Sequence, residues 1–163
     1  MRQPLNPHAK QVGLISDTHG LLRPEALDAL RGSELILHAG DVGKPEILDE
    51  LRKLAPVVAI RGNVDTSPWA RQLRETELVE TAAASFYLIH NINDLTLSPS
   101  AAGIQVVLFG HSHRPTQYEK EGVLYINPGS AGPRRFDLPI SLARFGLATK
   151  PWSVDFITLK TAD

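Results

Sequence analysis

The segment Val12-Gly-Leu-Ile-Ser-Asp-Thr-His19 joins a short apolar run to a polar ending. The apolar part predicts a buried strand, because runs of this length between polar residues are typical of strands covered on both faces. Pro24 marks the first turn of a predicted helix, and residues 35–39 predict a second buried strand. Pro45 begins a second predicted helix, and residues 57–60 predict a third strand. This alternation predicts parallel strands joined by right-handed crossovers.

The rest of the chain predicts further strands in a less regular order. They cover residues 78–81, 85–89, 105–109, 116–120, 123–126, 140–145 and 153–159. Glu121-Gly122 predicts a hairpin turn between two of them. Residues 62–69 predict a loop, residues 71–75 a helical turn or more loop, and residues 93–102 a short helix. We expect one domain over residues 1–163, with residues 1–10 as an N-terminal tail.

The composition excludes several classes of protein and of site. The 163 residues carry a formal net charge of -1, which gives no nucleic-acid footprint and no polybasic patch for a membrane surface. The chain has no cysteine, so disulfides, thiolate metal sites and cysteine nucleophiles are excluded. No apolar stretch approaches the ~20 residues that a membrane span needs, and the N-terminal tail lacks the apolar core of a signal peptide. We expect a cytoplasmic protein.

Seven side chains of the kinds that bind divalent metals occur at five places along the chain. They are Asp17, His19, Asp41, Asn63, His90, His111 and His113. Most follow the ends of predicted strands, and open α/β sheets place their active sites where such ends converge. Residues two apart in an extended segment point to the same side, which predicts that Asp17 chelates with His19 and His111 with His113.

The number and type of these ligands predict two ions rather than one. A single catalytic zinc-type ion usually takes three protein ligands and water, whereas two ions about 3.5–4 Å apart can share a bridging carboxylate. Mixed imidazole and carboxylate donors suit transition metals better than calcium, which prefers oxygen alone. We therefore expect two divalent transition-metal ions, with manganese favoured and iron, nickel, zinc or cobalt as alternatives.

The ordered series Asp-x-His, Gly-Asp, Gly-Asn, His and Gly-His-x-His is similar to that of the calcineurin-like metallophosphoesterase superfamily. Within that superfamily, Gly62-Asn63-Val64-Asp65 and Asn127-Pro-Gly-Ser130 resemble the small bacterial and archaeal phosphodiesterases. The resemblance covers residues 12 to about 159. It implies an α/β fold, a four-layer α/β/β/α sandwich in which helices flank two mixed sheets. It also implies a small phosphoester substrate, cleaved as a phosphodiester by attack of a metal-bridging hydroxide.

The resemblance implies a role for each candidate ligand. Asp17, His19 and His113 would hold the first ion, and Asn63, His90 and His111 would hold the second. Asp41 would bridge the two ions. Asn63 could also contact the substrate phosphate, so the residues expected to act in catalysis are Asp41, Asn63 and His90.

Two positions depart from the pattern of the wider superfamily. Val64 stands where many members have a histidine that serves as general acid, and the small phosphodiesterases lack that histidine too. Asn91-Ile92 follows His90 in place of the usual Gly-His, which removes an imidazole that would position the phosphate. Without a proton donor, activated phenolic or phosphodiester leaving groups should be cleaved best. Asp65 is the nearest replacement donor, although a supporting role is favoured.

Other interpretations remain open from the sequence. Asp17 and Asp41 could each cap the helix that follows. His38 is expected to be a hydrogen-bonded support of the site, and Trp69 to pack against the body of the protein. The alternative activities are a phosphomonoesterase or a dinucleotide polyphosphate hydrolase on the same fold. A non-enzymatic scaffold similar to the retromer subunit of this architecture is the third alternative, and a homo-oligomer is compatible with the sequence.

Overall fold

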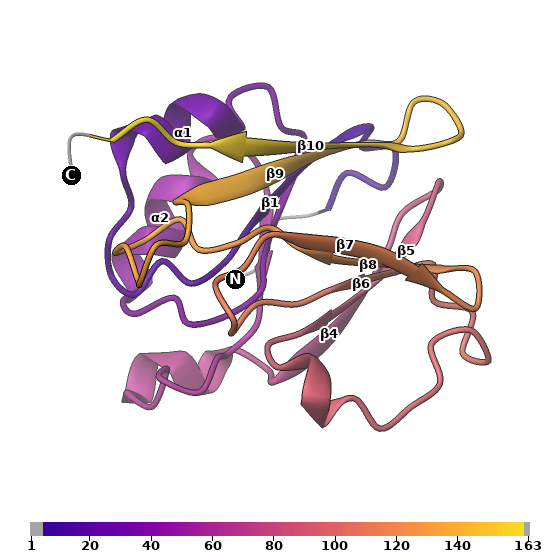
Figure 1. Ribbon diagram of the computed structural model, residues 1–163, viewed down its shortest axis with the longest axis horizontal. Helices are drawn as coiled ribbons and strands as arrows, with labels where there is room; N and C mark the ends of the chain where they lie inside the picture. Colours follow the sequence, from indigo (N-terminus) through magenta and orange to yellow (C-terminus); the bar gives the residue numbers. More distant parts are fainter. Residues whose placement is uncertain (1–4, 162–163) are drawn as a thin grey trace.

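The computed structural model describes residues 5–161 and contains two five-stranded β-sheets that lie face to face (Figure 1). The first sheet has the order β10 (Ser153–Thr158), β9 (Ser141–Gly146), β1 (Gln11–Ile15), β2 (Leu35–His38) and β3 (Val57–Ala59). The second has the order β4 (Thr76–Glu80), β5 (Ser85–Ile89), β6 (Val106–Leu108), β8 (Val123–Asn127) and β7 (Thr116–Lys120). The α/β sandwich expected from the sequence is thus present.

Both sheets are mixed. In the first, β1, β2 and β3 are parallel, with Val12 opposite Leu35 and Leu37 opposite Val58, whereas β9 and β10 are antiparallel additions at the other edge. In the second, β5, β6 and β8 are parallel, and β4 and β7 are antiparallel edge strands. The predicted parallel pairing of the first three strands is confirmed. Parallel pairing matters for the site because the carboxyl ends of these strands share one edge of each sheet.

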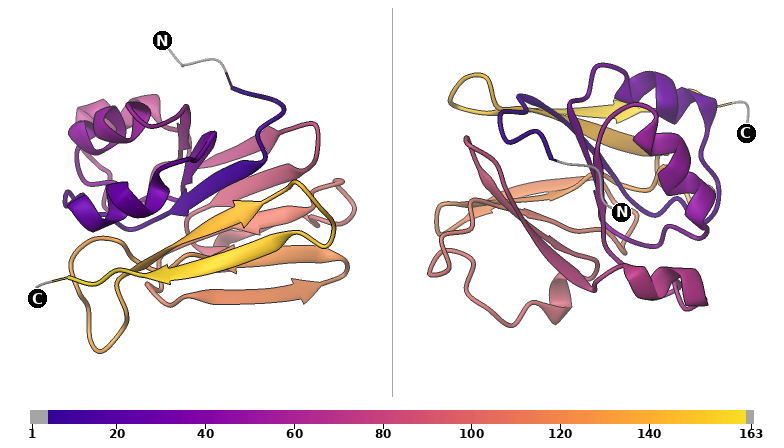
Figure 2. Two further views of the ribbon diagram at one scale, coloured as in Figure 1. Left: turned by 90° about the horizontal axis from the view of Figure 1, so that it is seen from above. Right: turned by 180° about the vertical axis from the view of Figure 1, so that it is seen from behind.

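Two helices cover the outer face of the first sheet (Figure 2). They are α1 (Pro24–Leu30) and α2 (Pro45–Arg52), and each begins at a proline, whose fixed φ suits the first turn. In α2 the buried side chains Ile47, Leu48 and Leu51 recur at helical spacing and form the face that packs on the sheet. The helices therefore hold β1, β2 and β3 in place from one side.

Alternate residues of the first sheet pack against different layers. Leu14 and Leu37 are buried in the core between the sheets, whereas Ile15 and Ile36 face the helices. Phe86 of the second sheet fills the same central core and contacts Phe145 edge to face, with ring centroids 5.6 Å apart. Because both faces of β1 and β2 are covered, their sequences are nearly continuous apolar runs.

The outer face of the second sheet carries only a thin fourth layer. The segment that covers it contains η2 (Ile92–Asp94), a single 3₁₀ turn, and contributes Ile92, Leu95 and Ile104 to a small apolar cluster. The helix predicted over residues 93–102 is therefore wrong. Pro99 cannot occupy a helix interior, and only one turn forms after Ser98, whose hydroxyl accepts from the Ala101 amide.

The predicted hairpin turn agrees with the structure. Glu121 and Gly122 have φ of 53° and 77°, the positive values that a two-residue hairpin turn needs, and they join β7 to β8. The helical turn or loop predicted over residues 71–75 only overlaps η1 (Pro68–Gln72), which begins inside the loop predicted over residues 62–69. Of the expected N-terminal tail, residues 1–4 lie outside the described part, and the Pro7 carbonyl accepts from the Ala82 amide at 2.7 Å. Within residues 5–161, no helix is long and apolar enough to span a membrane.

Candidate metal centre

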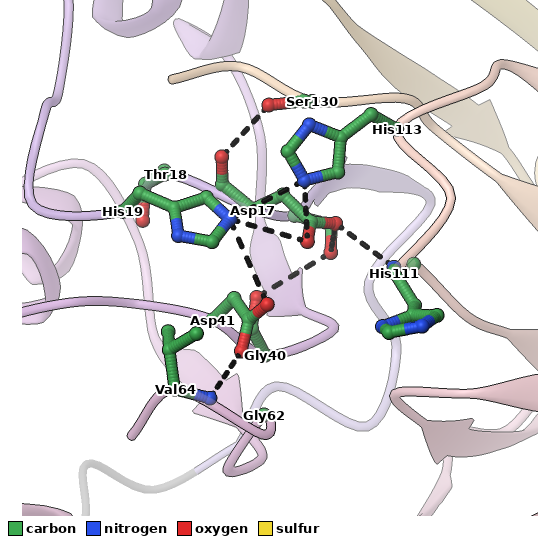
Figure 3. Close-up of polar contacts among 12 residues, drawn as sticks. Asp17, Thr18, His19, Gly40, Asp41, Gly62, Val64, His111, His113 and Ser130 are labelled. Atoms are coloured by element: carbon green, nitrogen blue, oxygen red, sulfur yellow. Dashed lines mark hydrogen bonds and ion pairs between the residues drawn. The ribbon is translucent and has the colours of Figure 1, made fainter. Parts of the chain in front are cut away.

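Loops at the carboxyl ends of β1, β2, β5 and β6 bring candidate ligands from distant parts of the sequence together (Figure 3). Asp17, Asp41 and His90 follow the first three of these strands, and the loop after β6 carries His111 and His113. The prediction that these side chains meet at strand ends is thus confirmed for most of the set. Two overlapping groups of three ionisable side chains form, and they share Asp17.

The first group contains Asp17, His19 and His113. Asp17 Oδ1 lies 3.3 Å from His113 Nε2 and 3.7 Å from His19 Nε2, and the two Nε2 atoms are 3.3 Å apart. Ligands about 2.1 Å from one tetrahedral or octahedral ion are roughly 3.0–3.4 Å apart from one another. Two of the three distances therefore have the spacing of donors that share one cation, and the Asp17–His19 distance of 3.7 Å is slightly longer.

The second group contains Asp17, Asp41 and His90. Asp41 Oδ2 lies 3.0 Å from His90 Nε2, and Asp17 Oδ1 is 3.8 Å from the same nitrogen. Asp41 Oδ2 is also 3.6 Å from His19 Nε2, which belongs to the first group. This carboxylate oxygen of the second group thus also lies close to a member of the first.

His111 and Asn63 lie at the edge of this cluster. The His111 amide donates to Asp17 Oδ2 at 3.2 Å, and its ring stands 5.3 Å from that of His90, measured between centroids. Asn63 is exposed and lines the same cavity as His90 and His111. Both residues are therefore on the side of the cluster that His90 occupies.

The predicted chelating pair of His111 and His113 is wrong. Their φ values are 72° and 63°, so the segment is left-handed rather than extended, and the two rings diverge. His113 contacts Asp17 and His19, whereas His111 contacts His90. Asp17 and His19 do meet as predicted, although their backbone is also left-handed, with φ of 55° and 45°.

Left-handed backbone is concentrated at the candidate ligands. Seven described residues other than glycine have positive φ, and five of them are Asp17, His19, Asp41, His111 and His113. Such conformations cost about 1–2 kcal/mol for an L-residue and cluster at functional sites, where the surrounding structure enforces them. This strain is an observation independent of the contacts, and it marks the same residues.

The capping interpretation of Asp17 and Asp41 is wrong. The N-cap of α1 is Arg23 and that of α2 is Lys44, and neither helix has a side-chain cap hydrogen bond. Instead, Asp17 Oδ2 accepts from the Ser16 hydroxyl at 2.6 Å, and Asp41 Oδ1 accepts from the Val64 amide at 3.0 Å. Each carboxylate is thus held by one oxygen and keeps its other oxygen directed at the cluster.

Several buried polar atoms of the cluster have no hydrogen-bond partner among residues 5–161. They include Asp17 Oδ1, His90 Nε2 and His113 Nδ1. A buried carboxylate oxygen or imidazole nitrogen without a partner is costly, and a bound cation would satisfy the first two atoms, which face the cluster. The donor set therefore fits divalent metal ions.

The electrostatics of the cluster keep its carboxylates ionised. Burial raises the pKa of Asp17, but the imidazoles of His113 and His19 together move it well below its usual range. Burial raises the pKa of Asp41 too, but the neighbouring imidazole of His90 and the Val64 amide outweigh it, so this pKa is also lowered. Metal ligands must be deprotonated, so both carboxylates are in the form that binds a cation. The same carboxylates raise the pKa of His90 against the effect of burial.

The carboxylate of Asp65 supports two loops of the candidate centre, as expected. Asp65 is 4% exposed, and its carboxylate accepts from the amides of Val42, Gly43 and Gly62 at 3.0, 2.9 and 2.9 Å. These amides belong to the loops that carry Asp41 and Asn63. One side chain thus joins the two loops, and both of its oxygens are occupied.

His38 is a buried support, again as expected. Its Nδ1 accepts from the Gly40 amide at 3.1 Å, so Nε2 carries the proton and donates to Thr18 Oγ1 at 3.0 Å. The Thr18 hydroxyl in turn donates to the Val42 carbonyl at 2.8 Å. Burial lowers the pKa of His38 to about 4, despite the nearby carboxylate of Asp17.

A pH dependence of stability follows from His38. The folded pKa of about 4 lies below the ordinary 6.5, so protonation favours the unfolded chain. The contribution of neutral His38 is complete above pH 6.5 and is lost as the pH falls toward 4. We expect wild type to lose about 2–3 kcal/mol more between pH 7 and 4.5 than His38→Asn, whose Oδ1 can still accept from Gly40. Urea unfolding of the metal-free proteins measures this difference, and equal pH dependence would contradict it.

Gly62 and Gly110 allow the loops of the candidate centre to approach one another closely. The sequence did not predict this function. A Cβ at Gly62 would lie 2.1 Å from Asp41 Oδ1, and one at Gly110 would lie 2.6 Å from Asp17 Oδ2. Neither distance is tolerable for a side chain. The only sequence signal is that a glycine precedes Asn63 and His111, which gives the residue type but not the neighbour that it avoids.

A cavity of about 320 Å³, here called the side pocket, lies beside this cluster. Its lining includes Arg61, Asn63, Glu75, His90, Asn91 and Asp94. Sequence reasoning placed Asn63 and His90 in a site but did not find Arg61, Glu75 and Asp94. They come from the loop after β3, the segment before β4 and η2, whose proximity depends on how the two sheets pack. Trp69, in contrast, packs against the helical layer, as expected.

The family comparison agrees with this geometry. The calcineurin-like phosphoesterase superfamily domain matches residues 11–150. The chain belongs to the calcineurin-like phosphoesterase superfamily. A relative named as a probable metallophosphoesterase, from Methanothermobacter thermautotrophicus, is 38% identical over 146 residues, which span 82% of this chain and 84% of the relative. The chain thus falls in the small prokaryotic subgroup of the superfamily.

Two further proteins are similar to this chain, one in sequence and one in fold. A protein of Methanocaldococcus jannaschii that is named a phosphodiesterase is 28% identical over 138 residues, or 73% of this chain and 82% of the relative. The crystal structure of Vps29 from Chaetomium thermophilum superposes with a TM-score of 0.74 at 17% identity, covering 93% of this chain and 97% of that one. The second likeness concerns the fold alone. The superfamily implies divalent metal ions, in agreement with the donor set.

Proposed function

We propose that this chain is a metal-dependent phosphodiesterase that works with two divalent ions. The observation that carries the proposal is the position of Asp41 Oδ2, which lies 3.0 Å from His90 Nε2 and 3.6 Å from His19 Nε2. A carboxylate between two imidazoles from separate loops suits a ligand shared by two ions. The relative named as a phosphodiesterase supports the diester part of the proposal.

Under this proposal Asp17, His19 and His113 hold one ion, and Asn63, His90 and His111 hold the other. Asp41 bridges the two. Manganese is the favoured metal, with iron, nickel, zinc and cobalt as alternatives, because metal availability often decides among such donor sets. When bound, the ions supply a Lewis acid for the phosphoryl oxygens and lower the pKa of a coordinated water.

The residues around the cluster favour a diester over a monoester. Val64 is 44% exposed beside the cluster, and its side chain cannot donate a proton to a leaving alkoxide. Asp65 cannot replace it, because both of its oxygens accept from backbone amides. A monoester dianion with an unactivated alcohol needs that proton more than an activated diester does. The chain therefore lacks the group on which monoester hydrolysis would depend.

A side-by-side assay tests the proposed function. Protein purified without chelator is analysed for metals, reconstituted with Mn²⁺, and assayed on bis-p-nitrophenyl phosphate and on p-nitrophenyl phosphate. We expect about two metal ions per chain, faster turnover of the diester, and loss of turnover with EDTA that Mn²⁺ restores. Failure to hydrolyse either ester with any added divalent metal, in a correctly folded protein, would favour the scaffold alternative.

Because Val64 cannot donate a proton, a substitution at this position is expected to raise monoesterase activity. We expect Val64→His to raise the ratio of monoesterase to diesterase activity about tenfold, because it restores an imidazole near the leaving group. Val64→Gln is the matched control, since it is polar and similar in reach but does not titrate. Steady-state rates on ethyl phosphate, whose alkoxide leaving group needs the proton, and on bis-p-nitrophenyl phosphate give the ratio. The same ratio in Val64→His and Val64→Gln would count against a role for the imidazole.

A further inference from the structure

We propose that the side pocket binds one alcohol arm of the diester and selects arms that are uncharged or cationic over arms that are anionic. The inference rests on the proposed function, because it assigns a substrate class to the same site. It concerns residues that lie outside the candidate ligand set, chiefly Glu75 and Asp94.

The side pocket opens onto the candidate centre. Asn63, His90 and His111, which would hold the second ion, all form part of its wall. His90 is 6% exposed, and its Nε2 has no hydrogen-bond partner among the described residues. A phosphate near this nitrogen therefore has an adjoining space of about 320 Å³ for one of its two alcohol groups. This volume is at the low end of small-molecule pockets, which suits an arm up to about the size of a nucleoside.

The charges on the wall of the side pocket sum to a net negative value. Arg61 Nη2 lies 3.3 Å from Glu75 Oε1, so the one cationic side chain of the lining is already paired with a carboxylate. Asp94 has no ion-pair partner in the part of the chain from residue 5 to 161. One guanidinium and two carboxylates give these three side chains a net charge of about -1. The charge of the ions proposed beside this pocket would be offset largely by Asp17, Asp41 and the substrate phosphate.

The uncharged part of the lining is suited to hydroxyl groups rather than to a second phosphate. Thr76 supplies a hydroxyl, and Asn91 a carboxamide whose oxygen already accepts from the Asn93 amide at 3.0 Å. Ile89 adds an apolar surface. Polyphosphate arms would meet the carboxylates of Asp94 and Glu75, and the one lining guanidinium, that of Arg61, is already paired with Glu75, which argues against a dinucleotide polyphosphate as substrate. The carboxylates of Glu75 and Asp94 can accept hydrogen bonds from arms that carry hydroxyl groups and can attract arms that carry an ammonium group.

Three methyl phosphodiesters test the charge selection. Each carries a methyl group, too small to compete for the pocket, and one variable arm: 2-(trimethylammonio)ethyl, its neutral isostere 3,3-dimethylbutyl, or 2-carboxyethyl. Their competitive inhibition constants are measured against bis-p-nitrophenyl phosphate with the Mn²⁺-loaded protein. We expect binding to weaken about fivefold from the ammonium to the neutral arm and again to the carboxylate, as for unit charges about 6 Å from a partly solvated carboxylate.

Variants that neutralise one carboxylate at a time test whether the charge selection comes from the lining of the side pocket. In Glu75→Gln and in Asp94→Asn, the ratio of the ammonium to the neutral inhibition constant should move at least twofold toward one. Glu80→Gln, on β4 but outside the side pocket, should leave the ratio and the rate as in wild type. Equal constants for the three arms, or unchanged ratios in both variants, would overturn the inference. If bis-p-nitrophenyl phosphate itself is not hydrolysed, the proposed function fails instead.

Discussion

Asp41→Asn is expected to lower phosphodiester turnover by at least about 10³-fold and to leave the fold intact. The substitution keeps the shape of the side chain and an oxygen that can accept from the Val64 amide, which lies 3.0 Å from Asp41 Oδ1 in wild type. It removes the charge that lies between His19 and His90, at 3.6 and 3.0 Å. A bridging carboxylate supports both ions at once, and metal ions supply several kcal/mol of transition-state stabilisation, which corresponds to three or more factors of ten.

Metal analysis and steady-state kinetics check this expectation together. The variant should bind fewer than two ions per chain and show wild-type far-ultraviolet circular dichroism. Asp49→Asn is the matched control, because the Asp49 carboxylate forms an exposed pair with Arg52 at 3.3 Å, and such pairs contribute little. A near-normal rate in metal-replete Asp41→Asn would exclude Asp41 from the centre.

Gly62→Ala is expected to lower turnover by at least about 10²-fold, although the substitution changes neither a candidate ligand nor any charge. The new methyl group would lie 2.1 Å from Asp41 Oδ1 and 2.2 Å from the Asp41 amide, so one of the two loops must shift. A displacement of about 1 Å in a catalytic group can cost two orders of magnitude in rate. Overpacking of this kind should also lower the free energy of unfolding by about 2–3 kcal/mol.

Gly103→Ala separates this steric effect from a general effect of replacing glycine. Gly103 has φ of 76° but open space around its Cβ position, with nothing within 4 Å. It should lose about 1 kcal/mol of stability through backbone strain and keep wild-type turnover. Urea unfolding and the diester assay distinguish the two variants. Wild-type turnover in Gly62→Ala would show that the loops do not need their close approach.

The sequence predicted the parts of the fold that depend on local pattern. Continuous apolar runs at residues 12–16 and 35–39 indicated buried parallel strands, and both strands have one face on the helices and the other on the second sheet. The same runs located Asp17 and Asp41, because a polar residue directly after a buried strand lies at the sheet edge. The helix predicted over residues 93–102 failed because Pro99 interrupts the segment and its apolar residues form no common face: Leu95 packs on the second sheet, whereas Leu97 is exposed.

The details of the candidate site depend on geometry that sequence pattern does not encode. The spacing of His111 and His113 is typical of an extended pair, but left-handed φ values send the rings to different neighbours. The side pocket is formed by segments from both sheets, so Arg61 and Asp94 become neighbours only after the sheets have packed. Residue type and order thus predicted which side chains gather, whereas the backbone conformation decides how they are divided between two groups.

The carboxylate of Asp65 has a consequence for selectivity among metals. It fixes the amides of Val42 and Gly43 on one loop and of Gly62 on the other, so neither loop can shift independently. Under the proposed function, the spacing of the ligands Asp41 and Asn63 would then be determined by main-chain atoms rather than by rotamers. Cations whose preferred bond lengths do not match this spacing would bind with a penalty.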